Sequence, residues 1–404
     1  MSYPFFFTWT SQRDAAPVQL VGGEGAFFDT ADRGRYLDLG SLIYQANAGH
    51  GHRRIIEAVR AQAERLCLSV PGAVYPEKTA LAEALLRHAP EGFTKVLFTL
   101  GGSDANENAL KIARLVTGRH KAISRYRSYH GATLGAVSLT GDWRRVSVEP
   151  AIPGVVHVLD LDERAGRTGS TDIPRVLELE GNVGAVFLES IVGGNGVLIP
   201  STESMLAIRE ACDAHGALLV VDEVLSGFGR TGRFFGLEHF DGLVPDMITM
   251  GKALTAGYGT LGAVLVHERV ARHFEERVLV TGLTHYAHPI SIAAALEAIR
   301  VYEDEGLVAR AAALGPVLRE GLEQLRDAHE CATGVRAIGL LGSLELTLDA
   351  EAMGRLKRAL DDERVHLHVN ARAHCAIVAP PLVIEESDLR EGIARLGRAL
   401  GRVL

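Results

Sequence analysis

Hydrophobic residues in the middle of the chain fall into short continuous runs that are separated by amphipathic segments. Such apolar runs are typical of buried strands, and apolar positions three or four residues apart are typical of helices. Buried strands that alternate with helices indicate an α/β fold with a mostly parallel central sheet that helices cover on both faces. The pattern predicts strands at 95–100, 121–126, 184–190, 217–224, 245–252 and 261–270, with helices at 103–116 and 204–216 among them.

Both ends of the chain have a different pattern. Residues 22–41 alternate short apolar stretches with glycine and aspartate turns, which predicts a hairpin. After about residue 289, two long helical segments are followed by short strands and helices. We therefore predict three parts, 1–55, 56–304 and 305–404, in which a large central domain is joined by a smaller α+β domain built from both chain ends.

The composition narrows the class of protein. The chain has 404 residues, 47% hydrophobic and 23% charged, which is ordinary for a globular protein. A net charge of -8 predicts no nucleic acid partner, and no apolar run is long enough to cross a membrane. The four cysteines lie far apart without a CxxC pair, so neither a metal site nor a disulfide framework is predicted. Because the N-terminus has no basic, apolar leader, we expect a cytoplasmic protein, with Cys67 and Cys212 buried as small apolar side chains.

The first candidate site is the glycine-rich turn GGSDANE, which follows the predicted strand at 95–100. Gly101 and Gly102 let the backbone approach a ligand closely, and the N–H groups that begin the next helix attract an anion such as phosphate. The hydroxyl of Ser103 adds a donor. The same residues also fit an ordinary turn in which Ser103 caps the helix.

Charged residues end two later strands. Asp222 and Glu223 close the run ALLVV, at the strand end where ligands bind in open α/β sheets. Lys252 follows the run MITM and is surrounded by glycines, whereas a surface lysine would lie on a polar helix face. A buried carboxylate needs a cationic partner, so the two side chains are predicted to face one crevice. The alternatives are a solvated turn carboxylate and a surface lysine.

A phosphate cradle, a carboxylate and a lysine on one rim of a sheet predict a site for pyridoxal 5′-phosphate (PLP) in the large domain. Lys252 would form a Schiff base with the aldehyde, and Asp222 would keep the pyridine nitrogen protonated so that the ring accepts electrons. Burial would lower the pKa of Lys252 and so supply a neutral amine. Tyr129 would stack on the ring or cover the end of the sheet, and Thr284 would donate to phosphate or form a turn before a helix.

One motif points to a different cofactor. Gly227, Gly229 and Gly232 match the spacing of the dinucleotide-binding fingerprint. That fingerprint opens a helix directly after a strand, whereas here two acids intervene and RFFGLEHF does not begin a helix. We therefore predict a loop of tight turns.

Taken together, the motifs resemble those of the class III, fold-type I, PLP-dependent aminotransferases, over nearly the whole chain from about residue 22. The family's SGSEANE-like turn appears as GGSDANE, and its YHG as Tyr129 to Gly131. Its acidic strand with GFGRTG, its PD-apolar-lysine-glycine segment, its threonine before a proline-led helix and its PPL follow in the same order. The chain departs from the family at Leu100 and Gly101, where asparagine and serine are frequent, and this leaves a backbone cradle for phosphate.

The resemblance implies a role for each of these residues. Lys252 would carry PLP and move a proton between the donor carbon and C4′, and Asp222 would pair with the pyridine nitrogen. A threonine that reaches the phosphate of the neighbouring subunit implies a homodimer with shared active sites. The other implied contacts are Val224 and Tyr129 on the two faces of the ring, Gly102 and Ser103 at the phosphate, Thr284 at the neighbouring subunit's phosphate, and Glu189, which would orient the region of Asp222 or gate the substrate.

The substrates follow from the same resemblance, which is to the ω-amino acid and amine branch of the family. The donor would be an amine or an ω- or β-amino acid, and the acceptor a keto acid, with pyruvate favoured over the 2-oxoglutarate of the ornithine and 4-aminobutyrate types. A bidentate arginine suits a carboxylate, and Arg372 resembles the family's movable C-terminal arginine in position. Trp9 and Tyr44 would line the donor pocket or pack on the hairpin, and packing on the hairpin is expected for Phe6.

Three kinds of function remain open from the residues. The first is an aminotransferase with ping-pong kinetics, which the resemblance favours. The second is another PLP enzyme of the same fold, such as an aminomutase, decarboxylase or racemase, which residues near the cofactor do not separate from the first. The third is a nicotinamide oxidoreductase, or a PLP-binding regulator without catalysis, although no DNA-binding segment accompanies the motifs.

Overall fold

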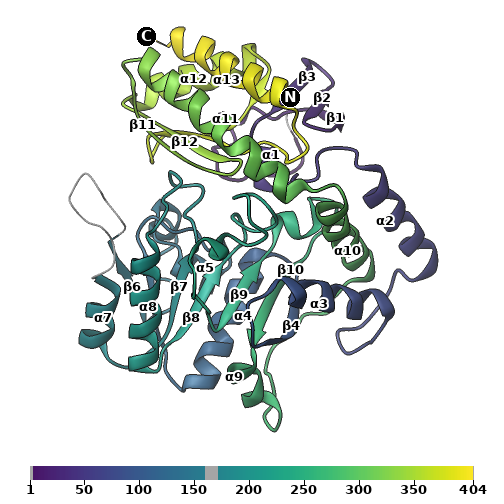
Figure 1. Ribbon diagram of the computed structural model, residues 1–404, viewed down its shortest axis with the longest axis vertical. Coiled ribbons are helices and arrows are strands. Elements are labelled where there is room, and N and C mark those ends of the chain that lie inside the picture. The colour runs from purple at the N-terminus through teal and green to yellow at the C-terminus, as the bar shows by residue number, and fades with distance from the viewer. Residues whose placement is uncertain (1–2, 160–171, 404) are drawn as a thin grey trace.

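Figure 1 shows the computed structural model of the chain, which describes residues 3–159 and 172–403. The strands are β1 (Leu20–Glu24), β2 (Phe27–Thr30), β3 (Gly34–Asp38), β4 (Phe93–Thr99), β5 (Lys121–Arg125), β6 (Val155–Val158), β7 (Val183–Glu189), β8 (Leu218–Asp222), β9 (Met247–Met250), β10 (Gly262–His267), β11 (Ala332–Ile338), β12 (Leu341–Leu346), β13 (Val365–His366), β14 (His368–Asn370) and β15 (Cys375–Val378). The helices are α1 (Ser41–Tyr44), α2 (Arg53–Arg65), α3 (Pro76–His88), α4 (Gly102–Thr117), α5 (Leu134–Leu139), α6 (Trp143–Val146), α7 (Asp172–Glu180), α8 (Thr202–His215), α9 (Glu268–Ala271), α10 (Pro289–Asp304), α11 (Leu307–Ala328), α12 (Ala350–Asp362) and α13 (Glu386–Gly401).

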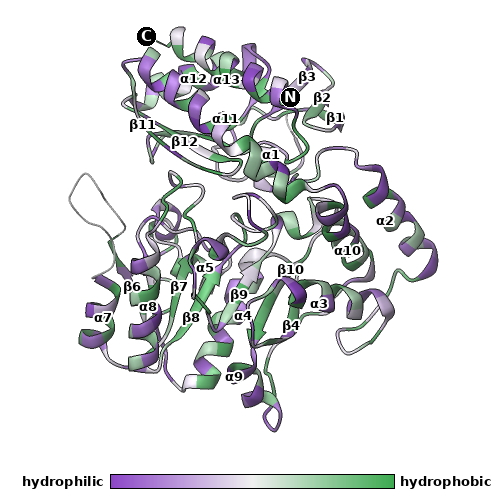
Figure 2. Ribbon diagram, in the orientation of Figure 1, coloured by the Kyte–Doolittle hydropathy of each residue, from purple (hydrophilic) through white to green (hydrophobic). Residues whose placement is uncertain are grey.

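The central sheet has the strand order β4-β10-β9-β8-β7-β5-β6. The strands from β9 to β6 are parallel, whereas β10 is antiparallel to both of its neighbours. Successive side chains of β8 point to opposite faces, so Val220 packs with α4 while Leu219 and Val221 pack with α8. Figure 2 shows the hydrophobic strands of this sheet between helices that carry hydrophilic stripes. The predicted α/β fold, mostly parallel and covered on both faces, is confirmed.

The sequence pattern does not predict β6 or β11. The strand β6, VVHV, lies at the edge of the central sheet and has only four residues, too few to show a period. The strand β11, ATGVRAI, also lies at an edge, and it contains Gly334 and Arg336 at partly buried positions. Edge strands tolerate polar residues because one side of the strand is not paired.

The N-terminal strands join the C-terminal part of the chain. The strands β1, β2 and β3 form an antiparallel sheet, and β13 extends it by pairing in parallel with β3. A separate sheet has the order β11-β12-β15-β14, with α11, α12 and α13 above it in Figure 1. This pairing supports a small domain built from both chain ends, whose boundaries after residues 55 and 304 stay a prediction.

The segment after β8 is the loop of turns that the sequence predicts. Residues 224–231 form successive turns, and φ is positive at Gly229 and Gly232, where glycine avoids the strain of a side chain. No helix starts directly after β8, because a short 3₁₀ helix begins only at Gly236. The fingerprint spacing in this segment therefore belongs to a loop.

Arg230, within this loop, is fully buried and connects three parts of the chain. Burial lowers its pKa to about 10, so the guanidinium stays charged at neutral pH. A buried charge without a carboxylate at hydrogen-bond distance must be satisfied by neutral acceptors. The guanidinium donates to the carbonyl oxygens of Leu340 and Pro380 and to the side chains of Ser41 and Asn47.

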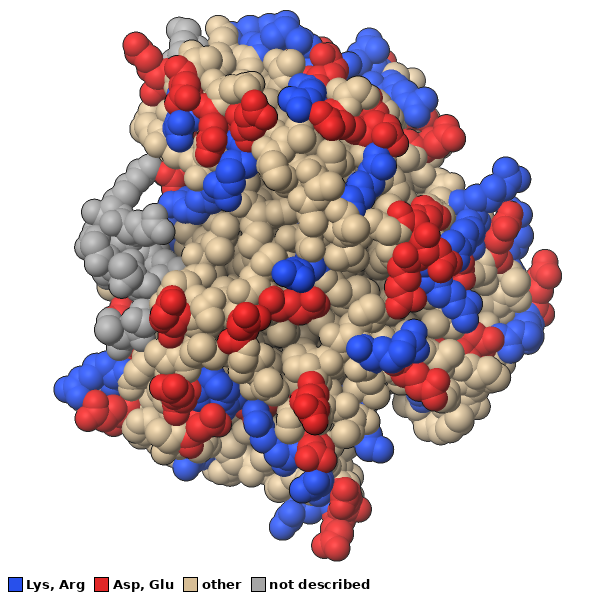
Figure 3. Space-filling model, viewed as in Figure 1, with Lys and Arg blue, Asp and Glu red and all other residues tan. Residues whose placement is uncertain are grey.

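The surface carries charges of both signs. On the face in Figure 3, acidic and basic side chains surround a central area without charged residues. Within the described parts of the chain, the helices lack the length and apolar character of a membrane span. All four cysteines are free thiols, and Cys212 is buried as predicted. The prediction for Cys67 is wrong: it is exposed, because it follows the end of α2 at Arg65 and so does not lie on the buried face of that helix.

Candidate active site

Three strands lead to one edge of the central sheet. The strand β8 ends at Asp222, β9 leads to Lys252, and β4 leads into α4, which begins at Gly102. The backbones approach closely there, because a Cβ on Gly251 would lie 2.8 Å from the nitrogen of Gly102. A Cβ on Gly102 would in turn lie 2.7 Å from the side chain of Val224. Glycine at these positions therefore brings the predicted anion cradle, the carboxylate and the lysine to one place.

The backbone of Lys252 is strained and its side chain is only partly accessible. Its φ is 42°, a value that few residues other than glycine adopt and that recurs at functional sites. Burial lowers the pKa of the amine; the charges of Asp222 and Glu189 oppose this change and Arg144 adds to it. Burial therefore makes the amine of Lys252 easier to deprotonate than the amine of an exposed lysine.

Tyr44 lies beside this amine. The Nζ of Lys252 is 5.6 Å from the centre of the Tyr44 ring, and the ring is buried. Among the described residues, the Tyr44 hydroxyl has no hydrogen-bond partner, and burial raises its pKa well above the usual range, so it is a neutral donor. A buried hydroxyl without a partner is costly unless a ligand or water satisfies it. The structure thus places the Tyr44 ring near the amine of Lys252, and its role in a donor pocket stays a prediction.

The Asp222 carboxylate is held by a network of three groups. Its Oδ1 accepts from the backbone N–H of Val224, and its Oδ2 accepts from Nδ2 of Asn106 and lies 2.8 Å from Nδ1 of His130. The Asn106 side chain is fixed in turn, because its Oδ1 accepts from the hydroxyl of Thr249. The sequence interpretation missed Asn106 and His130 as supports of Asp222, although both lie in the motifs GGSDANE and YHG.

Glu189 ends β7 directly beside Asp222 in the sheet register. Its Oε1 accepts from the N–H of Tyr129 at 3.0 Å, and its Oε2 accepts from the N–H of Gly193 at 3.1 Å. Burial raises the pKa of Glu189 to about 7, and the nearby Asp222 charge contributes to the rise. Glu189 therefore changes charge near neutral pH, next to the group that it would orient.

The raised pKa of Glu189 predicts a pH dependence of stability in the cofactor-free protein. Between pH about 4.5 and about 7 the folded chain keeps a proton that the unfolded chain has released. The free energy of unfolding should therefore fall as pH rises through this window, by about 3 kcal/mol for this group. Urea unfolding at several pH values should show a smaller fall for Glu189→Gln than for the wild type. The exposed control Glu276→Gln should retain the wild-type slope, and an equal slope in Glu189→Gln would contradict the assignment.

The first turn of α4 offers backbone donors rather than a serine cap. The N-cap position is Gly101, which has no side chain to cap the helix, and Ser103 lies inside the helix. The Oγ of Ser103 accepts from the N–H groups of Ala132 and Thr133 and lies 2.9 Å from the Thr133 hydroxyl. The interpretation of Ser103 as the cap is therefore wrong, and the first N–H groups of α4 have no partner within the helix.

An aromatic wall with one arginine stands beside this turn. The guanidinium carbon of Arg144 lies 3.8 Å from the centre of the Tyr129 ring and 5.4 Å from the Trp9 ring. The rings of Trp9 and Tyr129 meet edge to face at 6.4 Å. Phe6 is 87% exposed, so the expectation that it packs on the hairpin is wrong. The sequence interpretation did not single out Arg144, whose neighbours come together only in the fold.

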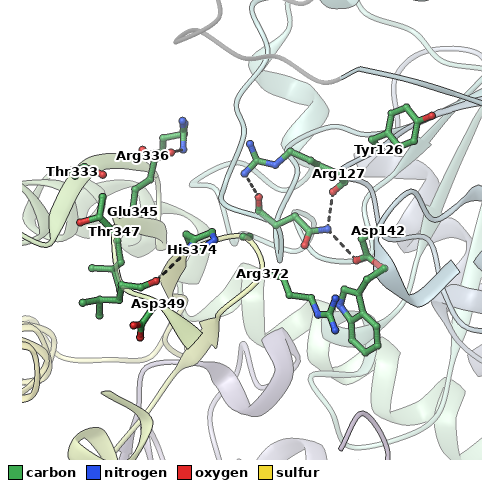
Figure 4. Close-up of a pocket in the computed structure, with 15 residues that line it drawn as sticks. Tyr126, Arg127, Asp142, Thr333, Arg336, Glu345, Thr347, Asp349, Arg372 and His374 are labelled. Atoms are coloured by element: carbon green, nitrogen blue, oxygen red, sulfur yellow. Dashed lines mark hydrogen bonds and ion pairs between the residues drawn. The ribbon is translucent and has the colours of Figure 1, made fainter. Parts of the chain in front are cut away.

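Arg372 contacts a different ring, that of Trp143. Its guanidinium carbon is 4.4 Å from the centre of the Trp143 ring, and Trp143 meets Trp9 at 6.2 Å. Arg372 lines a cavity of about 910 Å³ between the central domain and the β11–β15 region, shown in Figure 4 with Asp142. None of the predicted cofactor contacts lines this cavity, and Thr284 is exposed on the single chain.

Comparison with known proteins agrees with this geometry. The family described as aminotransferase class-III matches residues 9–400, nearly the whole chain. The chain belongs to the class III aminotransferases. Its catalytic class and its cofactor, PLP, are therefore those that the sequence predicted, and the alternative of a nicotinamide oxidoreductase is wrong.

Relatives of this aminotransferase have several named substrates. The acetylornithine aminotransferase of Mycobacterium tuberculosis (strain ATCC 25618 / H37Rv) is 37% identical over 399 residues, which cover 96% of this chain and 93% of the relative. A taurine:2-oxoglutarate aminotransferase from Bifidobacterium kashiwanohense, solved with PLP and glutamate, is 34% identical, with a TM-score of 0.92 over 98% of this chain and 95% of that one. An amine transaminase from an uncultivated Pseudomonas species, in a PLP-bound form, is 28% identical, with a TM-score of 0.95 over the full length of both chains.

The residues of this aminotransferase fit PLP. The start of α4 offers N–H groups to a phosphate, and Gly102 leaves room for the Val224 side chain beside it. The Asp222 carboxylate, held by its three neighbours, can face a protonated pyridine nitrogen. The partly accessible amine of Lys252 and the unpaired hydroxyl of Tyr44 complete the polar groups near that space.

Proposed function

We propose that this aminotransferase moves an amino group from an amine or an ω- or β-amino acid to a keto acid, with Lys252 as its catalytic residue. The observation that carries the proposal is the strained Lys252, whose amine has a pKa lowered by burial and lies at the meeting point of three strands, near the charge of Asp222. The names of the amine transaminase and of the taurine aminotransferase support a donor whose amino group is away from an α-carbon.

The acceptor has two candidates. Pyruvate is the one that the resemblance to the amine branch favours. The name of the taurine:2-oxoglutarate aminotransferase and the similarity to acetylornithine aminotransferases support the alternative, an ornithine-type enzyme that uses 2-oxoglutarate. A screen of amines, ω-amino acids and acetylornithine against both keto acids separates the two. Consumption of the donor without any keto acid would instead indicate an aminomutase or a decarboxylase.

The proton chemistry falls to two side chains. When bound, PLP supplies an aldehyde that takes up the amino nitrogen and a ring that accepts electrons. Asp222, fixed by Asn106 and His130, would stabilise the proton on the pyridine nitrogen. The amine of Lys252, whose pKa burial lowers, would take the proton from the donor carbon and deliver it to C4′ of the cofactor. A low pKa serves this role, because the amine must be free to accept the proton at neutral pH.

The remaining predicted contacts would hold the cofactor in place. Gly102 and the backbone of Ser103 begin α4 and would bind the phosphate. Tyr129 and Val224 would pack on the two faces of the ring, which keeps the ring from tilting. Glu189 would set the position of Tyr129 through the hydrogen bond to its N–H.

We also propose a homodimer with shared active sites, in which Thr284 reaches the phosphate of the neighbouring subunit. Two segments, 68–74 and 278–283, carry apolar side chains that the single chain leaves exposed. Tyr75, directly after the first segment, donates its hydroxyl to the carbonyl of Ala287, shortly after the second. Exposed apolar side chains in such number are typical of an interface. They are Leu68, Val70, Val74, Val278, Val280 and Leu283.

The dimer predicts the behaviour of a charged variant. In Val74→Asp/Val278→Asp, two carboxylates would be buried without partners at the interface, so the dimer should dissociate. Sedimentation should show a dimer for the wild type and a monomer for this variant, with transamination lost. Leu179→Asp, an exposed apolar position on α7, serves as the control and should remain a dimer. A wild-type monomer with full activity would contradict the proposal. The cytoplasmic location stays a prediction.

A further inference from the structure

Arg144 occupies a position that the predicted cofactor contacts leave unexplained. Its guanidinium lies over the ring of Tyr129 at 3.8 Å, and its charge lowers the pKa of Lys252. Arginine stacks on aromatic faces and keeps its N–H edges available for hydrogen bonds. The cation thus lies against the ring of Tyr129, and its charge acts on the amine of Lys252.

One edge of this guanidinium is fixed by the protein and the other is not. The Nε of Arg144 donates to both oxygens of Asp142, and Nη2 donates to Oδ2. Asp142 is itself held, because its Oδ1 accepts from the backbone N–H of Arg144 and its Oδ2 from Nδ2 of Asn195. Within residues 3–159 and 172–403, Nη1 has no hydrogen-bond partner. The anchored arginine therefore retains donors for an anion.

We propose that Arg144 binds the carboxylate of the keto acid acceptor, and of an ω-amino acid donor, in this active site. This inference rests on the proposed function and names the residue that selects its acidic substrates. The Tyr44 hydroxyl, buried and without a partner, is a neutral donor close to the same amine. A substrate carboxylate beside Tyr129 could accept charge-assisted hydrogen bonds from the Arg144 guanidinium, which Asp142 holds in place.

Arg372 is the other arginine that could bind the substrate carboxylate, and it contacts Trp143 rather than Tyr129. Its guanidinium stacks on Trp143, and Trp143 and Trp9 stand between it and Tyr129. Figure 4 shows Arg372 at the cavity between the domains, on the same side as Asp142. For Arg372 to reach a substrate beside Tyr129, its side chain would have to leave the Trp143 ring, whereas Arg144 is already in contact with Tyr129.

The test measures binding of propionate, a carboxylate that cannot accept an amino group, to the PLP-loaded enzyme by calorimetry. We expect Arg144→Gln to weaken propionate about 10- to 100-fold, since a hydrogen-bonded charge is lost. Arg144→Lys keeps the charge but not the planar fork, and should weaken it about tenfold. Arg372→Gln and the matched control Arg145→Gln, whose side chain pairs with Glu149, should stay within about twofold of the wild type.

A second measurement separates recognition from general damage. Pyruvate and acetaldehyde differ by the carboxylate, so the ratio of their kcat/KM values reports its recognition. Arg144→Gln should lower the ratio of the pyruvate value to the acetaldehyde value by the same factor as propionate binding, because an effect on the pKa of Lys252 acts on both substrates. Any of three results overturns the proposal. Propionate could bind Arg144→Gln as tightly as the wild type, or the affinity for propionate could fall in Arg372→Gln instead. The third result is a wild type that binds propionate no more tightly than propionamide. Amine-dependent turnover of the wild type would persist in those cases, so the proposed function would stand.

Discussion

Replacing Lys252 by alanine is expected to reduce keto acid-dependent transamination by at least about a thousandfold while the chain stays folded. The substitution removes both the amine that would carry the cofactor and the group that would move the proton. The fold should persist, because alanine tolerates the positive φ at this position no worse than lysine does. Removing an amine from a site that disfavours its charge should also cost the cofactor-free protein little stability.

Three measurements check this expectation. Turnover is followed with a keto acid in excess, unfolding by thermal scans of the cofactor-free proteins, and covalent attachment by borohydride reduction and peptide mass. The wild type should carry the reduced cofactor on the peptide that contains Lys252, and the alanine variant should carry none. Lys95→Ala, an exposed lysine on β4, should behave as the wild type does. Full turnover in Lys252→Ala would remove the basis of the mechanism.

The exchange of Asp222 for asparagine is expected to lower the rate of the half-reaction with an amine by about a hundred- to a thousandfold. The asparagine has nearly the same shape but cannot hold a proton on the pyridine nitrogen through a negative charge. It would also direct N–H groups at Asn106 and His130, where the carboxylate accepts. Because the Asp222 charge raises the pKa of Lys252, its loss should lower that pKa further.

The two consequences of this exchange are measured separately. Single-turnover absorbance of the loaded enzyme gives the rate, and the pH at which Lys252 reacts with an acylating reagent in the cofactor-free protein reports its pKa. The midpoint should move to lower pH in Asp222→Asn and stay in place in Asp241→Asn, an exposed control. A variant with an unchanged rate would show that Asp222 does not face the cofactor ring.

The sequence predicts those parts of the site that depend on local pattern. Lys252 and Asp222 stand at the ends of apolar strands, and the glycines around them mark close backbone approach, so their meeting at one edge of a parallel sheet follows from the fold class. The pattern cannot assign Asn106 to Asp222, because that contact joins residues 116 positions apart.

The position of Arg144 shows the same limit. It lies in the polar segment GDWRRV, where the sequence does not distinguish it from Arg145. In the structure, Arg145 pairs with Glu149 and not with the aromatic wall. Tyr129 and Trp9, the rings that single out Arg144, come from segments far apart in the chain. Thr284 is a further case. Its predicted role requires a neighbouring subunit, and in the single chain the residue is exposed.

The acceptors around Arg230 have a consequence for biosynthesis. Its carbonyl partner on Pro380 lies 150 residues later in the sequence, so a ribosome must add at least 150 residues after Arg230 before that guanidinium finds its last acceptor. In a nascent chain that stops earlier, the Arg230 guanidinium still needs water as a hydrogen-bond partner, so the surrounding loop cannot bury it. We therefore expect this part of the fold to close only after Pro380 has been synthesised.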